Sequence, residues 1–221
     1  MSGGDDAYWA QQREEMVTRD IEARGIREPR LLAAFRAVPR HQFVSDEQLD
    51  AAYEDRALPI PRAQTISQPY VVALMLEALD LRPSDRALDV GAGSGYAAAL
   101  LSRLAREVFA IEREPELAAL AQKRLTALGY TNVAVRAGDG TLGWPEHAPF
   151  DAILVSAAAA FVPPALEAEL APGGRMVIPL GPVRGGQSLV LLTRAKTGEL
   201  ERRELCEVQF VPLVGATTPS R

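Results

Sequence analysis

From residue 69 onward, short apolar runs alternate with longer segments whose apolar positions recur every three or four residues. The short runs predict buried strands, and the longer spacing predicts helices that cover a sheet. Strands are predicted at 86–90, 107–111, 132–136, 151–155 and 175–180, and helices at 70–80, 95–104, 115–128 and 163–170. This alternation is typical of an α/β fold with a mostly parallel central sheet and helices on both faces.

Two further strands are predicted near the end of the chain, at about 187–194 and 204–211. A short polar loop separates them, with no room for the crossover helix that parallel neighbours require. We therefore expect a C-terminal antiparallel hairpin at one edge of the sheet.

The first 68 residues follow a different pattern. Helical spacing covers 6–24 and 29–38, whereas 40–69 has few periodic apolar positions and contains three prolines. An irregular stretch of that length inside a compact domain is usually functional. We expect residues 1–68 to form a helical appendage with an active-site loop, packed as one structural unit with the α/β domain of residues 69–221.

Composition narrows the class of protein. The chain has 221 residues, 48% of them hydrophobic, and a formal net charge of −5, which argues against a nucleic-acid partner. No apolar run approaches the roughly 20 residues that span a membrane. The single cysteine, Cys206, fits a reducing compartment, and the two histidines, His41 and His147, lie too far apart in sequence to indicate a metal site. We expect a cytoplasmic monomer without metal, bound to neither nucleic acid nor membrane.

The segment LDVGAGSGY, residues 88–96, carries the strongest chemical signal. Its alternate glycines, Gly91, Gly93 and Gly95, allow a sharp turn and the close approach of a ligand, and the predicted helix that follows presents free N–H groups. Glu112 ends the next strand, about 20 residues after the first glycine, where an acid accepts hydrogen bonds from a ribose. The segment predicts a cofactor that contains a nucleoside.

The glycine spacing favours one kind of cofactor. Dinucleotide-binding folds have the pattern G-x-G-x-x-G, whereas this chain has G-x-G-x-G with Tyr96 at the position of the last glycine. The shorter pattern suits a cofactor without a pyrophosphate, such as S-adenosylmethionine. A dinucleotide oxidoreductase is the alternative. Asp139, just after the third strand, either accepts a hydrogen bond from an adenine amino group or is a turn aspartate.

Four longer stretches carry a family likeness. They are VPRHQFV (38–44), QTISQPYVVALMLEAL (64–79), DRALDVGAGSGY (85–96) and GDGTLGWPEHAPFDAILVSAAA (138–159). In these stretches the chain resembles the protein-L-isoaspartate (D-aspartate) O-methyltransferase family, and the likeness covers most of the chain. The resemblance implies a Rossmann-like class I S-adenosylmethionine-dependent methyltransferase fold.

The resemblance also implies an activity. Members of the family repair aged proteins by methylating the free α-carboxylate of L-isoaspartyl, and in some cases D-aspartyl, residues, which leaves S-adenosylhomocysteine. A carboxylate is already ionised at neutral pH, so the reaction needs no general base. The site must instead align the reacting atoms and exclude water.

Residue roles follow from the same likeness. The serine of the TIS segment, Ser67, is the expected catalytic residue, although it is equally placed to cap the helix that begins near Pro69. The expected substrate-binding residues are Thr65, Ile66, Ala157, Ala158 and Val214. The expected cofactor-binding residues are Asp89, Gly91, Gly93, Gly95, Glu112, Asp139 and Gly140.

The chain departs from the family pattern at two places. Pro61-Arg62-Ala63 stands where bacterial members usually have glycines, and Phe161 lies where a proline is usual. These departures bear on the path of the active-site loop and on the width of the peptide groove. Two other functions stay open: an O-methyltransferase acting on an aspartate of one dedicated peptide, and a non-catalytic cofactor-binding protein.

Overall fold

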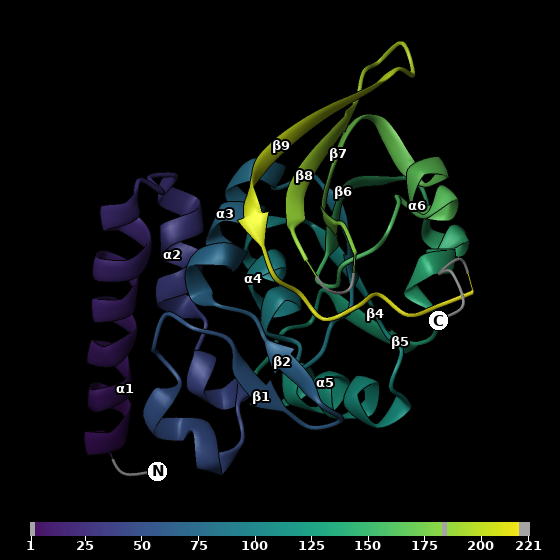
Figure 1. The fold of residues 1–221 in the computed structure, drawn as a ribbon. Coiled ribbons are helices and arrows are strands. Elements are labelled where there is room, and N and C mark those ends of the chain that lie inside the picture. The colour runs from purple at the N-terminus through teal and green to yellow at the C-terminus, as the bar shows by residue number, and fades with distance from the viewer. Residues whose placement is uncertain (1–2, 183–184, 217–221) are drawn as a thin grey trace.

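A seven-stranded sheet forms the centre of the computed structural model, which describes residues 3–182 and 185–216 (Figure 1). The strand order is β5-β4-β3-β6-β7-β8-β9. The strands are β3 (Arg86–Val90), β4 (Glu107–Glu112), β5 (Val133–Ala137), β6 (Phe150–Val155), β7 (Leu170–Leu180), β8 (Gln187–Arg194) and β9 (Leu200–Val208). Strands β3 to β7 run parallel, while β8 pairs antiparallel with both β7 and β9. The predicted parallel sheet and C-terminal hairpin are confirmed.

Helices cover both faces of this sheet because successive strand residues point to opposite sides. The strand residues Ala87, Val108 and Ala152 pack in one core with the helices of the first face. These helices are α2 (Pro29–Ala37), α3 (Pro69–Leu79), α4 (Tyr96–Leu104) and α5 (Pro115–Ala127). Leu88, Ile153 and their neighbours pack on the other face with α6 (Pro164–Ala168).

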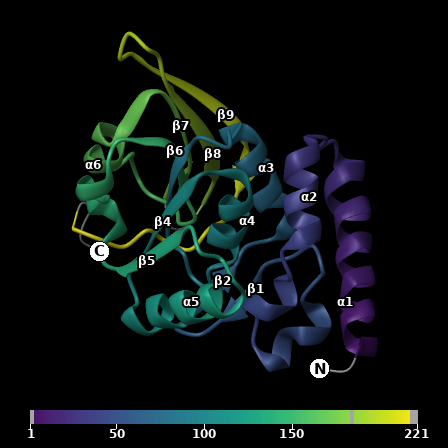
Figure 2. The same ribbon diagram turned by 180° about the vertical axis from the view of Figure 1, so that it is seen from behind.

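The N-terminal region packs against the first face rather than standing apart. Helix α1 (Gly3–Met16) continues through a π-helical turn (Val17–Ile21) and a short 3-10 turn (Glu22–Arg24). Met16 and Phe35 belong to the same apolar core as Ala99 of α4. Figures 1 and 2 show α1 and α2 outside α3 and α4, across the sheet from α6. Within residues 3–182 and 185–216, no helix is both long and apolar enough to cross a bilayer.

Two expectations about local structure are wrong. Residues 40–69 are not irregular throughout: they contain 3-10 turns at Arg40–Phe43 and Asp46–Ala51 and a hairpin of β1 (Leu58–Ile60) with β2 (Gln64–Ile66). Elements this short leave no periodicity to detect. The last strand runs from 200 to 208, not from 204 to 211, because an exposed edge strand is mostly polar.

The β1–β2 hairpin lies against the glycine loop, and its tip is anchored elsewhere. A Cβ added to Gly93 would lie 3.3 Å from Cδ1 of Ile60. At the tip, Arg62 and Ala63 have φ values of 64° and 54°, in the left-handed region that favours glycine. Arg62 forms an ion pair with Glu116, in the first turn of α5. The hairpin therefore bridges from the N-terminal region to α5.

The strained tip generates a stability prediction. Ala63→Gly should raise the free energy of unfolding by about 0.5–1 kcal/mol, because relief of about 1–2 kcal/mol of left-handed strain exceeds the greater unfolded-state freedom of glycine. Denaturant titration measures the change. The control is Ala10→Gly in α1, an exposed helical position where glycine should destabilise by about 1 kcal/mol. A loss of stability in Ala63→Gly would contradict the strain argument.

Candidate active site

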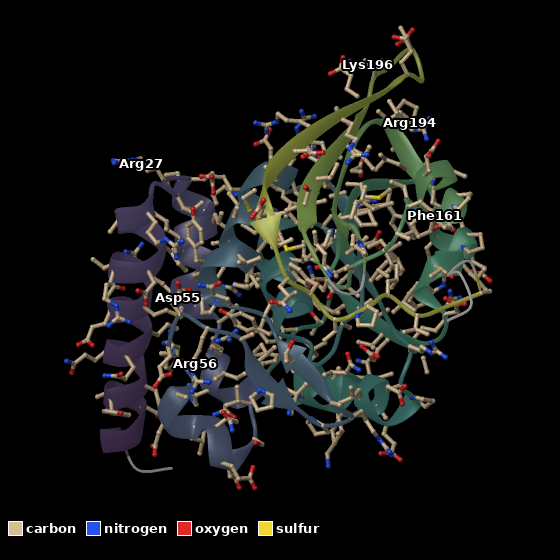
Figure 3. All side chains as sticks on the ribbon, in the orientation of Figure 1. Arg27, Asp55, Arg56, Phe161, Arg194 and Lys196 are labelled. Atoms are coloured by element: carbon tan, nitrogen blue, oxygen red, sulfur yellow. The ribbon has the colours of Figure 1, made fainter. Side chains whose placement is uncertain are left out.

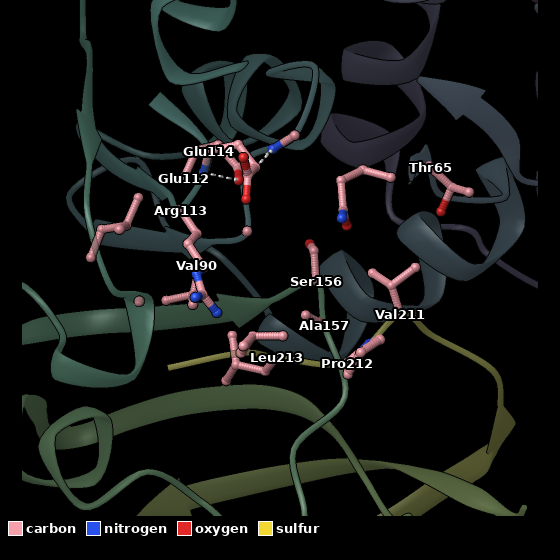
Figure 4. Close-up of a pocket in the computed structure, with 16 residues that line it drawn as sticks. Thr65, Val90, Glu112, Arg113, Glu114, Ser156, Ala157, Val211, Pro212 and Leu213 are labelled. Carbon is pink, nitrogen blue, oxygen red and sulfur yellow. Dashed lines mark hydrogen bonds between the residues drawn. The ribbon is translucent and has the colours of Figure 1, made fainter. Parts of the chain in front are cut away.

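A cavity opens at the carboxyl ends of β3, β4 and β6, where parallel α/β sheets bind their ligands (Figure 4). The β1–β2 hairpin borders it on one side, and the segment after β9 borders it on the other. Its lining residues are Gln64, Thr65, Val90, Gly91, Gly93, Ile111, Glu112, Arg113, Glu114, Gly140, Ser156, Ala157, Val211, Pro212, Leu213 and Val214.

The glycine loop and Glu112 form the floor of this cavity. All three glycines of the loop have positive φ, with values of 86°, 53° and 90° in chain order. Glu112 accepts hydrogen bonds from the backbone N–H of Gly93 at 2.7 Å and of Glu114 at 3.0 Å. A carboxylate has about four acceptor positions, so two remain for hydroxyl groups of a ligand. The arrangement suits the predicted ribose contact, and it also shows that Glu112 holds the loop in place.

Asp89 is buried beneath the same loop without a partner. Its side chain is fully buried, and neither carboxylate oxygen has a hydrogen bond to any described residue. Burial, together with the negative charge of Glu112, raises the pKa of Asp89 to about 7. Asp89 therefore does not support the loop by hydrogen bonds, and its unmet acceptors suit a ligand that carries positive charge.

Asp139 and Gly140 are separated by the structure. Gly140 lines the cavity, whereas Asp139 lies in a neighbouring pocket with Gly215 and Ala216. The Asp139 carboxylate accepts hydrogen bonds from the N–H and hydroxyl of Thr141, at 2.9 and 2.7 Å, and from the Ala216 N–H at 2.6 Å. Asp139 thus caps the turn at Gly140–Leu142 and holds the segment after β9 at Ala216.

Ser67 is not the cap of α3. The N-cap residue is Gln68, and the helix is capped from a distance by Asp55, whose carboxylate accepts a hydrogen bond from the Tyr70 N–H at 3.0 Å. The Gln68 amide donates to the same carboxylate at 2.8 Å. Ser67 forms no hydrogen bond with the described residues. Its hydroxyl is therefore available, and the capping alternative is wrong.

Ser67 lies where two further cavities meet. One is a small cavity that it shares with Thr65, Gly91 and Ser156. The other is an open groove that begins at Thr65 and Ser67. The remaining residues of the groove are Asp55, Arg56, Ala57, Gln68, Val71, Glu207, Val208, Gln209 and Phe210. Ser67 does not line the first cavity, but the small cavity shares Thr65, Gly91 and Ser156 with it. Ser67 thus stands between the small cavity and the open groove.

The other predicted substrate residues are distributed unevenly. Thr65 is exposed and lines all three cavities, while Ile66 is buried and lines the small one. Ala157 and Val214 line the first cavity, at the carboxyl ends of β3, β4 and β6, which is the candidate cofactor cavity. Ala158 differs, because its N–H donates to the Val211 carbonyl at 2.8 Å and its carbonyl accepts from the Leu213 N–H at 2.7 Å. The backbone groups of Ala158 are thus occupied by the segment after β9 and are not available to a peptide.

Phe161 does not narrow the groove. Its side chain is 45% exposed and does not line the open groove. Figure 3 shows it on the opposite side of the molecule from Asp55 and Arg56.

Sequence reasoning missed several lining residues. Ser156 is the first residue after β6, at an edge where ligand contacts are expected, so its position was a usable signal. Gln64 lies at the start of β2, a strand that the sequence pattern did not predict. Arg113 and Glu114 follow Glu112 and enter the cavity because the chain turns there into α5.

The fold and the site define a class. A mostly parallel seven-stranded sheet with an antiparallel last hairpin, a G-x-G-x-G loop after β3 and an acid at the end of β4 make this an S-adenosylmethionine-dependent methyltransferase fold. A solved structure named protein-L-isoaspartate O-methyltransferase superposes with a TM-score of 0.83 at 29% identity, over 92% of this chain and 66% of that one. A Plasmodium falciparum protein solved in complex with S-adenosyl-L-homocysteine gives a TM-score of 0.80 at 26% identity, over 91% of this chain and 98% of that one.

The particular family follows from sequence. The family model for protein-L-isoaspartate (D-aspartate) O-methyltransferase matches residues 11–218, so the chain belongs to that family. A protein-L-isoaspartate O-methyltransferase of Methylorubrum extorquens is 56% identical over 95% of this chain and 92% of its own length. Protein-L-isoaspartate O-methyltransferase 2 of Pelobacter propionicus is 54% identical over 93% of this chain and 91% of its own length. The family resemblance inferred from the motifs is confirmed.

The raised pKa of Asp89 generates a prediction about stability and pH. An unfolded aspartate titrates near pH 4, so from about pH 4 to pH 7 the folded protein keeps a proton that the unfolded chain has lost. The free energy of unfolding of the wild type, relative to that of Asp89→Asn, should therefore fall as the pH rises from about 4 to about 7. The decrease should reach up to about 4 kcal/mol and level off above this window.

Denaturant titrations of both proteins at several pH values measure this difference. Asp50→Asn, at an exposed carboxylate, serves as the control for removal of one negative charge. A difference between wild type and Asp89→Asn that stays constant from pH 4 to pH 8 would contradict the assigned shift.

Proposed function

We propose that this protein is a repair enzyme that transfers a methyl group from S-adenosylmethionine to the free α-carboxylate of L-isoaspartyl residues in damaged proteins and peptides. D-aspartyl residues are a further proposed substrate. The observation that carries the proposal is the free Ser67 hydroxyl between an open groove and the small cavity that adjoins the cofactor cavity, in a chain that belongs to the isoaspartate methyltransferase family.

The residues of the cavity fit S-adenosylmethionine. The cofactor has a sulfonium and an ammonium group, and the cavity is lined by two acids, Glu112 and Glu114, against one base, Arg113, with the unpartnered carboxylate of Asp89 buried nearby. Gly91 and Gly93 line the cavity without a side chain, whereas a Cβ at Gly95 would lie 3.3 Å from side-chain atoms of α5. In this proposal the glycine loop borders the amino-acid part of the cofactor, Glu112 binds the ribose, and Gly140 borders the adenine.

Asp139 can reach an adenine amino group only with its remaining lone pairs, because three hydrogen bonds from Thr141 and Ala216 already occupy its carboxylate. Those bonds hold the carboxylate next to Gly140. In this proposal Asp139 belongs to the cofactor site as a residue that positions Gly140.

The chemistry of the site needs no base. When bound, the cofactor supplies a methyl group on a positively charged sulfur, and the carboxylate oxygen gains the O–C bond as the C–S bond breaks and its electron pair stays on sulfur. No proton moves, and neither histidine lines any of the described cavities. His41 is stacked on Trp9 and bonded to Tyr53, and burial lowers its pKa to about 4.

The protein therefore acts by aligning the carboxylate with the methyl group and by excluding water from the site. The hairpin tip reaches α5, and the segment from Val211 to Val214 lies along the other wall, so the cofactor cavity is enclosed by two parts of the chain distant in sequence. The groove admits the substrate peptide at Thr65 and Ser67. Ala157 and Val214 border the same space, and Ala158 acts indirectly by holding the C-terminal segment.

We also propose that the protein works as a monomer in the cytoplasm, without a nucleic-acid partner. The net charge of −5 and the single cysteine support this. The shared apolar core of the N-terminal helices and the α/β domain supports the proposal that residues 1–68 and 69–221 act as one unit.

The substrate can be tested directly. Incubation with labelled S-adenosylmethionine should place a base-labile methyl ester on several unrelated isoaspartyl peptides and none on their aspartyl counterparts. Label on the aspartyl peptides alone, or on neither form, would exclude the proposed function. Label confined to one isoaspartyl sequence would indicate an enzyme dedicated to one peptide.

Ser67 provides the second test of this function. Ser67→Ala should lower kcat/KM for an isoaspartyl peptide about 10- to 100-fold, because the carboxylate loses a charge-assisted hydrogen bond and its alignment. The affinity for S-adenosylhomocysteine should stay within twofold, measured by calorimetry. Ser102→Ala, whose hydroxyl bonds the Ala99 carbonyl on α4, is the control. Loss of folding or of cofactor binding in Ser67→Ala would instead indicate a structural role.

A further inference from the structure

Three hydroxyl groups lie along the path from the cofactor cavity to the open groove. Ser156 lines the cofactor cavity and the small cavity. Ser67 lines the small cavity and the groove, and Thr65 lines all three spaces. Figure 4 shows Ser156 beside Ala157, with its side chain directed into the cavity that Thr65 borders from the hairpin. Ser67 and Ser156 therefore line the same small cavity, which adjoins the groove at Ser67 and the cofactor cavity at Ser156.

The backbone holds Ser156 firmly in this position. Its N–H donates to the Val90 carbonyl at 2.8 Å, at the point where β6 and β3 end side by side. A Cβ added to Gly91 would lie 3.8 Å from Cβ of Ser156, so the serine faces the glycine loop at contact distance. Ser156 directly follows a central strand, and sites supported by strands are held more precisely than sites on loops.

The hydroxyl of Ser156 has no structural task within the fold. It forms no hydrogen bond with the described residues, whereas Ser102 bonds its own helix at 2.7 Å. Ser156 is half-buried, so a ligand that enters the cavity displaces water from its hydroxyl. A half-buried hydroxyl without a protein partner, at the end of a central strand, is suited to bind a polar group of a ligand.

We propose that Ser156 is a second hydroxyl that binds the α-carboxylate of the isoaspartyl substrate, on the side opposite Ser67. The inference rests on the proposed function. A carboxylate has two oxygens, and methylation requires one of them to face the methyl group while the other is held. Ser67, directly after β2, binds the carboxylate from the side of the groove. Ser156, directly after β6, binds the carboxylate oxygen that is not methylated.

The geometry favours the substrate over the cofactor as the partner of Ser156. The ribose side of the cavity is marked by Glu112, which follows β4, whereas Ser156 follows β6 and shares the small cavity with Ser67. Because a carboxylate loses charge as it is methylated, a hydroxyl that binds it acts more on substrate affinity than on the transition state. Ser156 should therefore affect KM more than kcat.

The test compares Ser156→Ala with Ser156→Thr, which retains a hydroxyl, and with the Ser102→Ala control. Calorimetry measures the affinity for S-adenosylhomocysteine, and then for an isoaspartyl peptide in its presence. Ser156→Ala should weaken peptide binding and raise KM about tenfold, with kcat and product affinity changed less than threefold. Ser156→Thr should restore peptide affinity to within threefold of the wild type. Should Ser156→Ala not fold, Ser156→Cys replaces it with a weaker donor of similar size.

The outcomes distinguish a failure of the Ser156 assignment from a failure of the proposed function. Unchanged peptide affinity and KM in Ser156→Ala would overturn the assignment, and so would an equal loss of affinity for S-adenosylhomocysteine, which would place Ser156 in the cofactor site. A Ser156→Thr variant as impaired as Ser156→Ala would also overturn it, because the effect would then be one of packing. A wild-type protein that methylates no isoaspartyl peptide would instead disprove the proposed function.

Discussion

The site depends on the attachment of the glycine loop to β4 by Glu112. The loop leaves β3 through three residues with positive φ, a conformation that fixes no single path by itself. The Glu112 carboxylate removes that freedom by binding the N–H groups of Gly93 and Glu114. Because the N–H groups of Gly91 and Ala92 bind the Ile111 carbonyl as well, the end of β4 determines where the loop lies. The β1–β2 hairpin and α5 pack against the loop in this position.

Burial, together with the negative charge of the same Glu112, raises the pKa of Asp89. The carboxylate of Glu112 stabilises the loop, yet its charge acts on a second carboxylate that is fully buried and without a hydrogen bond. A protein that tolerates such a cost at one position usually does so at a functional site. A positive charge near the loop would lower the electrostatic cost of both carboxylates.

The sequence predicted the sheet well because buried parallel strands and covering helices have strong and different periodicities. It predicted the glycine loop and Glu112 because the backbone chemistry there permits few residue types. It failed where a side chain acts at a distance: no pattern shows that Asp55 caps α3 or that Asp139 holds Ala216. Short elements such as β1 and β2 escaped for the same reason, since long-range contacts rather than local propensity stabilise them.

These distant contacts explain how the site keeps its hydroxyl groups available. A serine just before a helix ordinarily binds the helix N-terminus, which would occupy the Ser67 hydroxyl. Asp55 takes over that task from 15 residues before Tyr70. Similarly, Val211 and Leu213 pair with Ala158, which satisfies the backbone after β6 and leaves the neighbouring Ser156 side chain without a structural duty. Residues outside the reacting centre thus satisfy the local backbone, so that the hydroxyl groups beside the cavity can serve a substrate.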